Sequence, residues 1–201
     1  MSELHQALAE IDAIRTQVAR ATQFRGYGPV SVAASGLLAL AAGAFESGQQ
    51  AGSQDLWHFL RIWTAVAAVA VLLAAIETVR RARRAHSSFA APMIHAAIEQ
   101  LLPSLGVGLL LTLVLARIAP QEGWMLPGLW QLFFSLGIFA SRRFVPRPMF
   151  AAALWYLAAG LVCLAWAGTS RQLSPWLMAL PFGIGQCLIA AVLKFGSYEE
   201  S

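Results

Sequence analysis

Long stretches without a charged residue are the feature that most constrains how this chain folds. No Asp, Glu, Lys or Arg occurs in residues 123–140, 148–170 or 172–193. A helix of about 20 apolar residues crosses the hydrocarbon core of a bilayer, so each stretch predicts a transmembrane helix. Of the 201 residues, 58% are hydrophobic and 12% are charged, against roughly 45–50% and 25% in soluble domains. These values exclude a soluble globular domain, a disordered chain and a disulfide-stapled secreted domain.

Six apolar segments with short connections can be drawn along the chain. They cover about residues 29–45, 57–79, 100–118, 124–140, 148–168 and 175–193. A bilayer offers the backbone no hydrogen-bond partner, so only helices and closed barrels span it. We therefore expect an all-α, polytopic membrane bundle of six transmembrane helices within residues 27–195. Residues 1–26 would precede it as a cytoplasmic helix, and residues 196–201 would follow as a short acidic cytoplasmic tail.

The positions of the cationic residues predict the orientation of this bundle. The chain has 14 Lys and Arg, and most of them fall on one side of the predicted membrane. That side holds Arg15, Arg20, Arg25, Arg80, Arg81, Arg83, Arg84, Arg142, Arg143, Arg147 and Lys194. Cytoplasmic loops carry an excess of Lys and Arg, so we expect a multi-pass protein of the bacterial inner membrane with both termini in the cytoplasm. Membrane lipids with anionic headgroups, and not nucleic acid, are the acidic partner that this arrangement favours.

The segment before the first span predicts an amphipathic helix within residues 1–26. Its apolar residues recur mostly every three or four positions, which places them on one helical face. They are Leu4, Leu8, Ile11, Ile14, Val18 and Phe24. Such a helix lies along the headgroups, packs beneath the bundle or pairs with a helix of another protein. The sequence leaves these three alternatives open.

Two ionisable residues, Glu46 and Arg61, mark a first candidate site. Charged groups within spans are costly, so each one is a site candidate whose partner must be named. Glu46 ends the first span and Arg61 lies near the start of the second, at the same end of one helical hairpin. Two interpretations remain: an ion pair that closes a short loop, or the charged mouth of a solute-binding site.

A second ionisable group, Glu77, His95 and Glu99, lies on the predicted cytoplasmic side. His95 and Glu99 are four residues apart and share a helical face, while Glu77 precedes Arg80 by three residues and suits helix-surface pairing. A histidine with two carboxylates is a ligand set for a divalent metal. Two ligands at this spacing often occur by chance, however, so we expect pairing or solvation at the interface. We predict no cofactor.

Two amides and two proline-glycine interruptions lie deeper in the predicted spans. Gln131 and Gln186 would either hydrogen-bond across helices or contact a ligand in a cavity. Pro103 and Pro181 each precede two glycines, one set in each half of the chain. Interrupted helices in corresponding halves mark the central site of some transporters. The plainer interpretation, which we favour, is that they are kinked spans whose small residues allow close helix contact.

Two strings of residues carry a resemblance to a known family. The stretch from Leu126 to Gly137, LPGLWQLFFSLG, and the stretch from Ser174 to Gln186, SPWLMALPFGIGQ, resemble a family of small bacterial inner-membrane proteins of unassigned function. The opening from Ile11 through Phe24 and on to Gly36 is similar to that family too. The similarity runs from end to end, and its motifs are structural in character. Members are often encoded beside a winged-helix transcriptional regulator, which the resemblance implies as a partner.

Some members of that family carry an automatic label as carotene-cleaving oxygenases, and this chain argues against the label. A non-haem iron centre of that kind needs a convergent set of histidine or carboxylate ligands. The four histidines, His5, His58, His86 and His95, are scattered over both predicted faces and the N-terminal helix. The resemblance therefore transfers no catalytic residue.

Three classes of function fit the sequence. The first is a non-enzymatic membrane sensor or scaffold that contacts a cytoplasmic protein through the N-terminal helix. The alternative is a small transporter or channel subunit for an apolar or weakly polar solute, oligomeric because six spans make a thin wall. An intramembrane enzyme rests only on Glu77, His95 and Glu99. The residues favour the first class, with Gln131, Gln186, Glu46 and Arg61 as candidate ligand contacts.

Overall fold

The structure is a computed structural model that describes residues 5, 28–49, 55–85, 90–141 and 148–195. Within these ranges, the side chains of residues 78, 81–85, 90–98, 101 and 195 are not described. The predicted N-terminal helix, apart from residue 5, and the predicted acidic tail lie outside the described residues.

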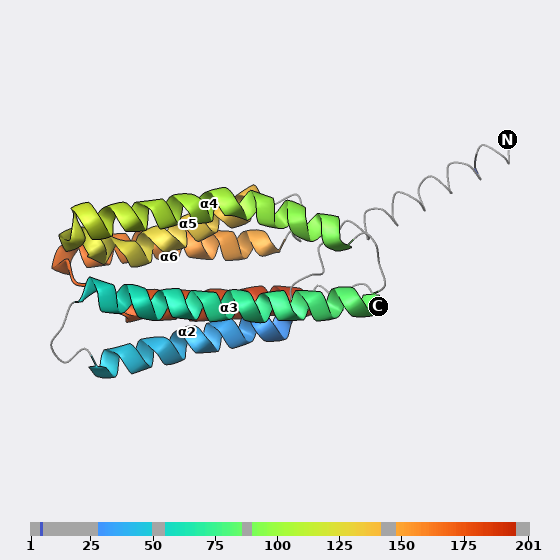
Figure 1. The fold of residues 1–201 in the computed structure, drawn as a ribbon, viewed down its shortest axis with the longest axis horizontal. Helices are drawn as coiled ribbons and strands as arrows, with labels where there is room; N and C mark the ends of the chain where they lie inside the picture. Colours follow the sequence, from blue (N-terminus) through green and yellow to red (C-terminus); the bar gives the residue numbers. More distant parts are fainter. Residues whose placement is uncertain (1–4, 6–27, 50–54, 86–89, 142–147, 196–201) are drawn as a thin grey trace.

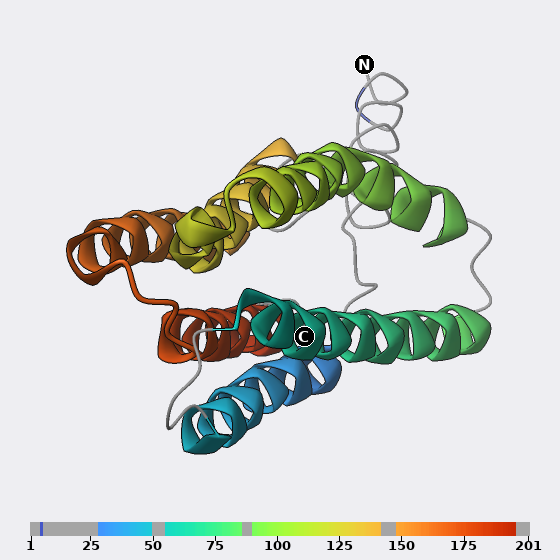
Figure 2. The ribbon, with the colours of Figure 1, turned by 60° about the vertical axis from the view of Figure 1, so that its left-hand side comes forward.

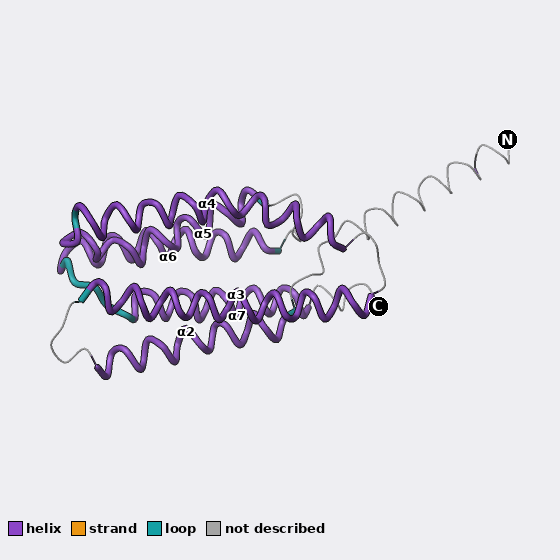
Figure 3. The backbone as a smooth tube through the Cα atoms, viewed as in Figure 1, coloured by secondary structure: helices purple, strands orange, loops and turns teal. Residues whose placement is uncertain are grey.

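Six α-helices and one 3-10 helix make up the described part of the chain, which contains no strand (Figures 1 and 3). In chain order these are α2 (Pro29–Gln49), α3 (Leu56–Ala85), α4 (Ala90–Ile118), η1 (Pro120–Met125), α5 (Leu126–Ala140), α6 (Met149–Ser170) and α7 (Trp176–Phe195). The all-α prediction is confirmed. Each predicted apolar segment overlaps one helix, although α3 ends six residues after its segment, α4 begins ten residues before its segment, and the fourth segment begins in η1.

Local sequence explains where several helices begin and end. Pro29 opens α2 and Pro120 opens η1, because the first helical turn needs no N–H and already has the φ of proline. α6 ends where Arg171 adopts a left-handed φ of 49°, a conformation that terminates helices. α3 continues beyond the end of its predicted span to Ala85, and α4 begins before its predicted span, at Ala90. Arginine and alanine favour the helix, so helix continues beyond the apolar length.

The six described α-helices form two layers of three. α2, α3 and α7 lie together in one layer, and α4, α5 and α6 lie in the other (Figure 1). The view in Figure 2 keeps the same two groups apart. α6 and α5 contact α7 between the layers, whereas α3 and α4, although consecutive in the chain, contact each other little. The two layers are therefore joined mainly through α7.

The helices run lengthwise side by side, so their ends gather at two ends of the bundle (Figure 1). We call one the Glu122 end; it holds the end of α2, the start of α3, η1, the end of α6 and the start of α7. The opposite one is the Arg80 end. It holds the start of α2, the end of α3, the end of α5, the start of α6 and the end of α7.

Two clusters of buried side chains form the core, one toward each end. The cluster toward the Glu122 end contains Ala39, Leu56, Phe59, Leu60, Trp63, Ala116, Leu126, Leu173, Met178 and Ala179. The cluster toward the Arg80 end contains Val32, Ile138, Met149, Ala152, Ala153, Tyr156, Ile189 and Ala190. Phe182, on α7, packs against both, which again makes α7 the central helix.

Glycines bring two helix pairs into close contact. Between α5 and α6, a Cβ on Gly128 would lie 2.9 Å from the carbonyl oxygen of Gly160, and a Cβ on Gly160 would lie 2.9 Å from that of Gly128. Between α2 and α7, a Cβ on Gly36 would lie 3.1 Å from the carbonyl oxygen of Gly183. Small residues are how membrane helices approach closely enough for van der Waals packing to hold them together.

The outer surface of the helices is apolar. Within the described residues, five helical segments are long and apolar enough to cross a membrane: Pro29–Gln49, Leu56–Glu77, Pro120–Ala140, Met149–Ser170 and Trp176–Lys194. Large apolar side chains point outward from them and from α4, among them Val71, Leu72, Leu110, Val162 and Trp166. An exterior of this kind suits lipid and not water. The prediction of a multi-pass membrane protein is confirmed at this level.

Candidate functional site

Gln131 lies in the core and bonds across helices. Its side chain on α5 is 0% exposed, and Nε2 donates to the carbonyl oxygen of Leu177 on α7 at 2.8 Å. That carbonyl has no helical donor, because residue 181 is proline and lacks the N–H that would bond four residues back. The sulfur of Cys163, on α6, lies 3.4 Å from the same oxygen. The amide and the thiol therefore complete the hydrogen bonding of an interrupted helix.

Other polar groups in the described spans are also used within the bundle. The indole N–H of Trp155 on α6 donates to the carbonyl oxygen of Pro181 at 2.9 Å. The hydroxyl of Ser135 on α5 donates to the carbonyl oxygen of Ala153 at 2.8 Å. The indole N–H of Trp130 donates to the hydroxyl of Thr112 at 2.8 Å, which joins α5 to α4. Such bonds satisfy polar groups that lipid would leave unpaired.

Gln186 lies elsewhere, at the contact between α7 and α2. It is half-buried, and its Cβ lies 2.9 Å from where a Cβ on Gly36 would be. Nine residues of helix separate it from Leu177, the partner of Gln131, which is roughly 13 Å along the axis. The structure does not bring the two amides together, and the contacts of Gln131 favour the interhelical interpretation.

The two proline-glycine interruptions also differ from one another. Pro181 is buried, and a Cβ on Gly185, beyond it, would overlap the ring of Tyr156. Pro103 is exposed, and a Cβ on Gly106 would meet no atom within 4 Å. The interruption at Pro181 therefore faces the core, whereas in the other one Pro103 faces outward and Gly108 is buried against Phe133.

Glu46 and Arg61 do not pair; instead, each has a different partner. Glu46 is 0% exposed, and its Oε2 accepts the indole N–H of Trp63 at 2.9 Å. Its Oε1 is buried and has no hydrogen-bond partner among the described residues. Arg61 is exposed, and its Nε donates to the carbonyl oxygen of Trp57 at 3.3 Å. The ion-pair interpretation is wrong, because Arg61 points out of the helical hairpin and Trp63 points into it.

An ion pair does occur at the same end, between other residues. The guanidinium of Arg171 lies 3.9 Å from Oε1 of Glu122, and Oε2 of Glu122 accepts the indole N–H of Trp124 at 2.9 Å. Arg171 is exposed and Glu122 is partly exposed, so solvent screens the pair and its contribution to stability is small. It ties η1 to the end of α6.

Glu77 supports the start of α2. Its Oε2 accepts the backbone N–H of Ser31 at 3.1 Å, and its carboxyl group packs directly on Gly28. A carboxylate at a helix start satisfies an unpaired N–H and is attracted by the helix dipole. Glu99 is exposed on α4, and the side chain of His95 lies outside the described residues. Among the described residues no three histidine, cysteine or carboxylate side chains are grouped to hold a metal.

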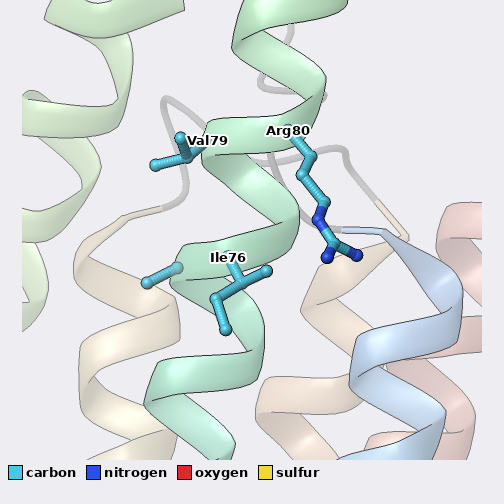
Figure 4. A pocket seen from close by; sticks show the side chains of 4 residues that line it. Ile76, Val79 and Arg80 are labelled. Atoms are coloured by element: carbon cyan, nitrogen blue, oxygen red, sulfur yellow. The ribbon is translucent and has the colours of Figure 1, made fainter.

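A shallow hollow lies on α3 near the Arg80 end. It measures about 360 Å³ and is lined by Ala75, Ile76, Val79 and Arg80. Figure 4 shows Val79 and Arg80 pointing to opposite sides of the helix. The lining is therefore apolar apart from Arg80, whose side chain leads away from Val79.

Comparison with protein-family models, with curated proteins and with solved structures finds no match for this chain.

Trp63 and Cys163 are the site residues that the sequence pattern did not single out. For Cys163 a signal existed: a proline within an apolar span leaves the carbonyl four residues earlier without its donor, so Pro181 implied a donor beside Leu177. For Trp63 no comparable signal existed, because its indole bonds a residue 17 positions away on another helix.

Proposed function

We propose that this chain is a six-span protein of the bacterial inner membrane that acts as a non-enzymatic sensor or scaffold for a cytoplasmic partner. The observation that supports it best is the attachment of the N-terminal segment. That segment joins α2 at the Arg80 end, where Glu77 of α3 bonds to Ser31 and packs on Gly28. A displacement of the segment would therefore act on α2 and α3 together.

The sixth span in this proposal is α4. Its apolar part, Leu102–Ile118, is shorter than the other spans, and its 17 residues are about 25 Å long as a helix. α4 continues as helix back to Ala90, so backbone hydrogen bonds are kept through the headgroup region. A short apolar length is accommodated by local thinning of the bilayer.

The orientation in this proposal rests on which helix ends share one end of the bundle. The ends that adjoin the arginine-rich segments are the start of α2, the ends of α3 and α5, the start of α6 and the end of α7. They all lie at the Arg80 end, which would be cytoplasmic by the excess of positive charge. Exposed Trp57, Trp166 and Trp176 belong to the opposite end, as residues of an aromatic belt at the outer interface.

This orientation is tested by labelling single cysteines with a membrane-impermeant maleimide. In a Cys163→Ser, Cys187→Ser background, Gln121→Cys is expected to react in intact spheroplasts. Ser87→Cys is expected to react only after the membrane is permeabilised. Reaction of Ser87→Cys in intact spheroplasts would reverse the orientation.

Membrane lipids are the second partner in the proposal. The hollow on α3 is lined by three apolar side chains and by Arg80. That pairing suits an acyl chain and an anionic headgroup at the cytoplasmic boundary, where a basic residue contributes about 1 kcal/mol of attraction to an anionic leaflet. A homo-oligomer would bury part of the remaining apolar exterior.

The partner interaction predicts a specific loss on truncation. Deleting residues 2–24 is expected to abolish capture of the cytoplasmic partner, while the thermal unfolding midpoint of the bundle stays unchanged. The resemblance described above makes a winged-helix regulator encoded nearby the first protein to test, by pull-down with purified components.

Deletion of residues 196–201 is the matched control, because it removes the other predicted cytoplasmic segment and should leave capture intact. Equal capture by the full chain and by the chain lacking residues 2–24 would contradict the proposal. The transporter alternative depends on Gln131 and Gln186 as ligand contacts, and the hydrogen bond from Gln131 to Leu177 favours a structural role for the first of them.

A further inference from the structure

The carboxyl group of Glu46 is the most unusual polar group in the described part of the chain. Its side chain is 0% exposed, and it is the only titratable residue of α2. One oxygen accepts the indole N–H of Trp63, and the other, Oε1, is buried without a hydrogen-bond partner among the described residues. Burial of an ionised carboxylate costs several kcal/mol unless it is paired.

The neighbouring elements offer no cation that bonds to this carboxyl group. On α3 the titratable side chain facing it is His58, which interacts with it only through space. Asp55 is exposed and bonds the N–H of Trp57. Arg61 is exposed and bonds the carbonyl oxygen of Trp57.

The other packed element, α7, has no charged side chain at this end either; its one charged residue, Lys194, lies at the opposite end. α2 packs on it through Gly43, whose Cβ position overlaps the methyl group of Ala179 and lies 3.8 Å from the carbonyl oxygen of Pro175. Residues 175–179 contain no titratable side chain. Arg171, just before α7, is exposed and lies against Glu122.

The space beside the carboxyl group of Glu46 limits which cation can neutralise its charge. A side chain with 0% exposure has no water-sized space beside it, so neither a water molecule nor a metal ion with its ligands fits. Trp63, which bonds the carboxyl group, belongs to an aromatic cluster: the ring of Phe59 lies 5.9 Å from that of Trp63 and 6.3 Å from that of Trp130, centroid to centroid. A proton is the one cation that needs no added volume.

We propose that Glu46 is a proton-binding site at the Glu122 end, and that the packed bundle is its protonated form. Release breaks the O–H bond at Oε1, leaves the electron pair on oxygen and passes the proton to solvent water. The resulting carboxylate then needs hydration, which requires the end of α2 to move away from Trp63. This site is independent of any cytoplasmic partner.

The sign of the pH dependence follows from the two states. The folded chain holds a proton that the unfolded chain releases to water at neutral pH, so stability falls as pH rises. One proton changes the unfolding equilibrium constant by at most about tenfold per pH unit. The Glu46→Gln variant, which keeps an oxygen acceptor for Trp63 and carries no charge, is expected to lose this dependence.

The test is infrared spectroscopy of the full chain in lipid nanodiscs at neutral pH. The wild type is expected to show the C=O stretch of a protonated carboxylic acid that disappears at alkaline pH, and Glu46→Gln is expected to lack it. Glu122→Gln is the matched control. Glu122 also accepts a tryptophan N–H, but it is partly exposed and lies beside Arg171, so its replacement should leave the band in place.

Each outcome bears on the proposal. A wild-type spectrum without a protonated carboxyl band at neutral pH, or a band that survives in Glu46→Gln, would overturn it. If Glu46→Gln does not fold, Trp63→Phe takes its place. Loss of the indole donor is expected to shift the band, and an unshifted band would show that it arises elsewhere.

Discussion

Replacing Gly160 with leucine is expected to leave no folded bundle. Gly160 on α6 faces Gly128 on α5, and a Cβ at residue 160 would lie 2.9 Å from the carbonyl oxygen of Gly128 and 2.9 Å from Cγ of Leu132. A side chain can rotate away, but a helix backbone yields only if α5 and α6 separate. Overpacking a well-packed core costs about 1–3 kcal/mol, and separation of two helices would exceed that range. Yield and size-exclusion profile in mild detergent would measure the loss.

Gly106→Leu is the matched control for this prediction. A Cβ at residue 106, on α4, would meet no atom within 4 Å, so a leucine there would face outward. Replacement of glycine in a helix removes a cost of about 0.8–1.0 kcal/mol relative to alanine. The control is therefore expected to fold at least as well as the wild type. A Gly160→Leu protein that elutes and unfolds like the wild type would contradict the α5–α6 contact.

Gln131→Leu is expected to destabilise the bundle by about 1–2 kcal/mol. The substitution removes the N–H that bonds to the carbonyl oxygen of Leu177 at 2.8 Å. That oxygen then faces the core with only the thiol of Cys163, 3.4 Å away, as a weak donor. Reversible unfolding in mixed detergent micelles measures the free energy of unfolding of each variant.

A double-mutant cycle with Pro181→Ala separates this cause from lost packing. Alanine at residue 181 has an N–H that can bond to the carbonyl oxygen of Leu177 within α7, so Gln131→Leu should then cost about 1 kcal/mol less. Gln186→Leu is the control amide, since no hydrogen bond of its side chain is found among the described residues. If Gln131→Leu lowers the free energy of unfolding by the same amount in the wild-type and in the Pro181→Ala background, the carbonyl oxygen of Leu177 is not the important partner of Gln131.

Much of the fold could be predicted from the chain alone. The uncharged stretches located the helices because the thickness of the hydrocarbon core requires about 20 apolar residues in a row. The predicted limits fall short at the Arg80 end, where α3 continues to Ala85 and α4 begins at Ala90. The extension of α3 contains four arginines, whose helix propensity and not apolarity stabilises it, so a criterion based on hydropathy stops too early there.

The candidate site was predicted less well, and Glu46 shows why. Arg61 was predicted as the partner of Glu46 because the positions of the two residues in the sequence place them at the same end of a helical hairpin. Successive helical residues are turned by about 100°, so Arg61 and Trp63 point in opposite directions from α3. Which of them faces α2 depends on the rotation of the helix. Spans that are apolar on every side contain no pattern that reveals this rotation.

By itself, therefore, the sequence determined that the described part of this protein is built from helices, where its apolar segments lie and where its cationic residues gather. Those properties follow from the solvent, because lipid selects for length and apolarity along one helix at a time. Only the tertiary structure decided which polar groups meet: Gln131 with Leu177, Glu46 with Trp63, and Glu77 with Ser31. The physical reason is that these contacts depend on how each helix is rotated and on how closely neighbouring helices approach. Both are set by the contacts that glycine and proline residues make between helices.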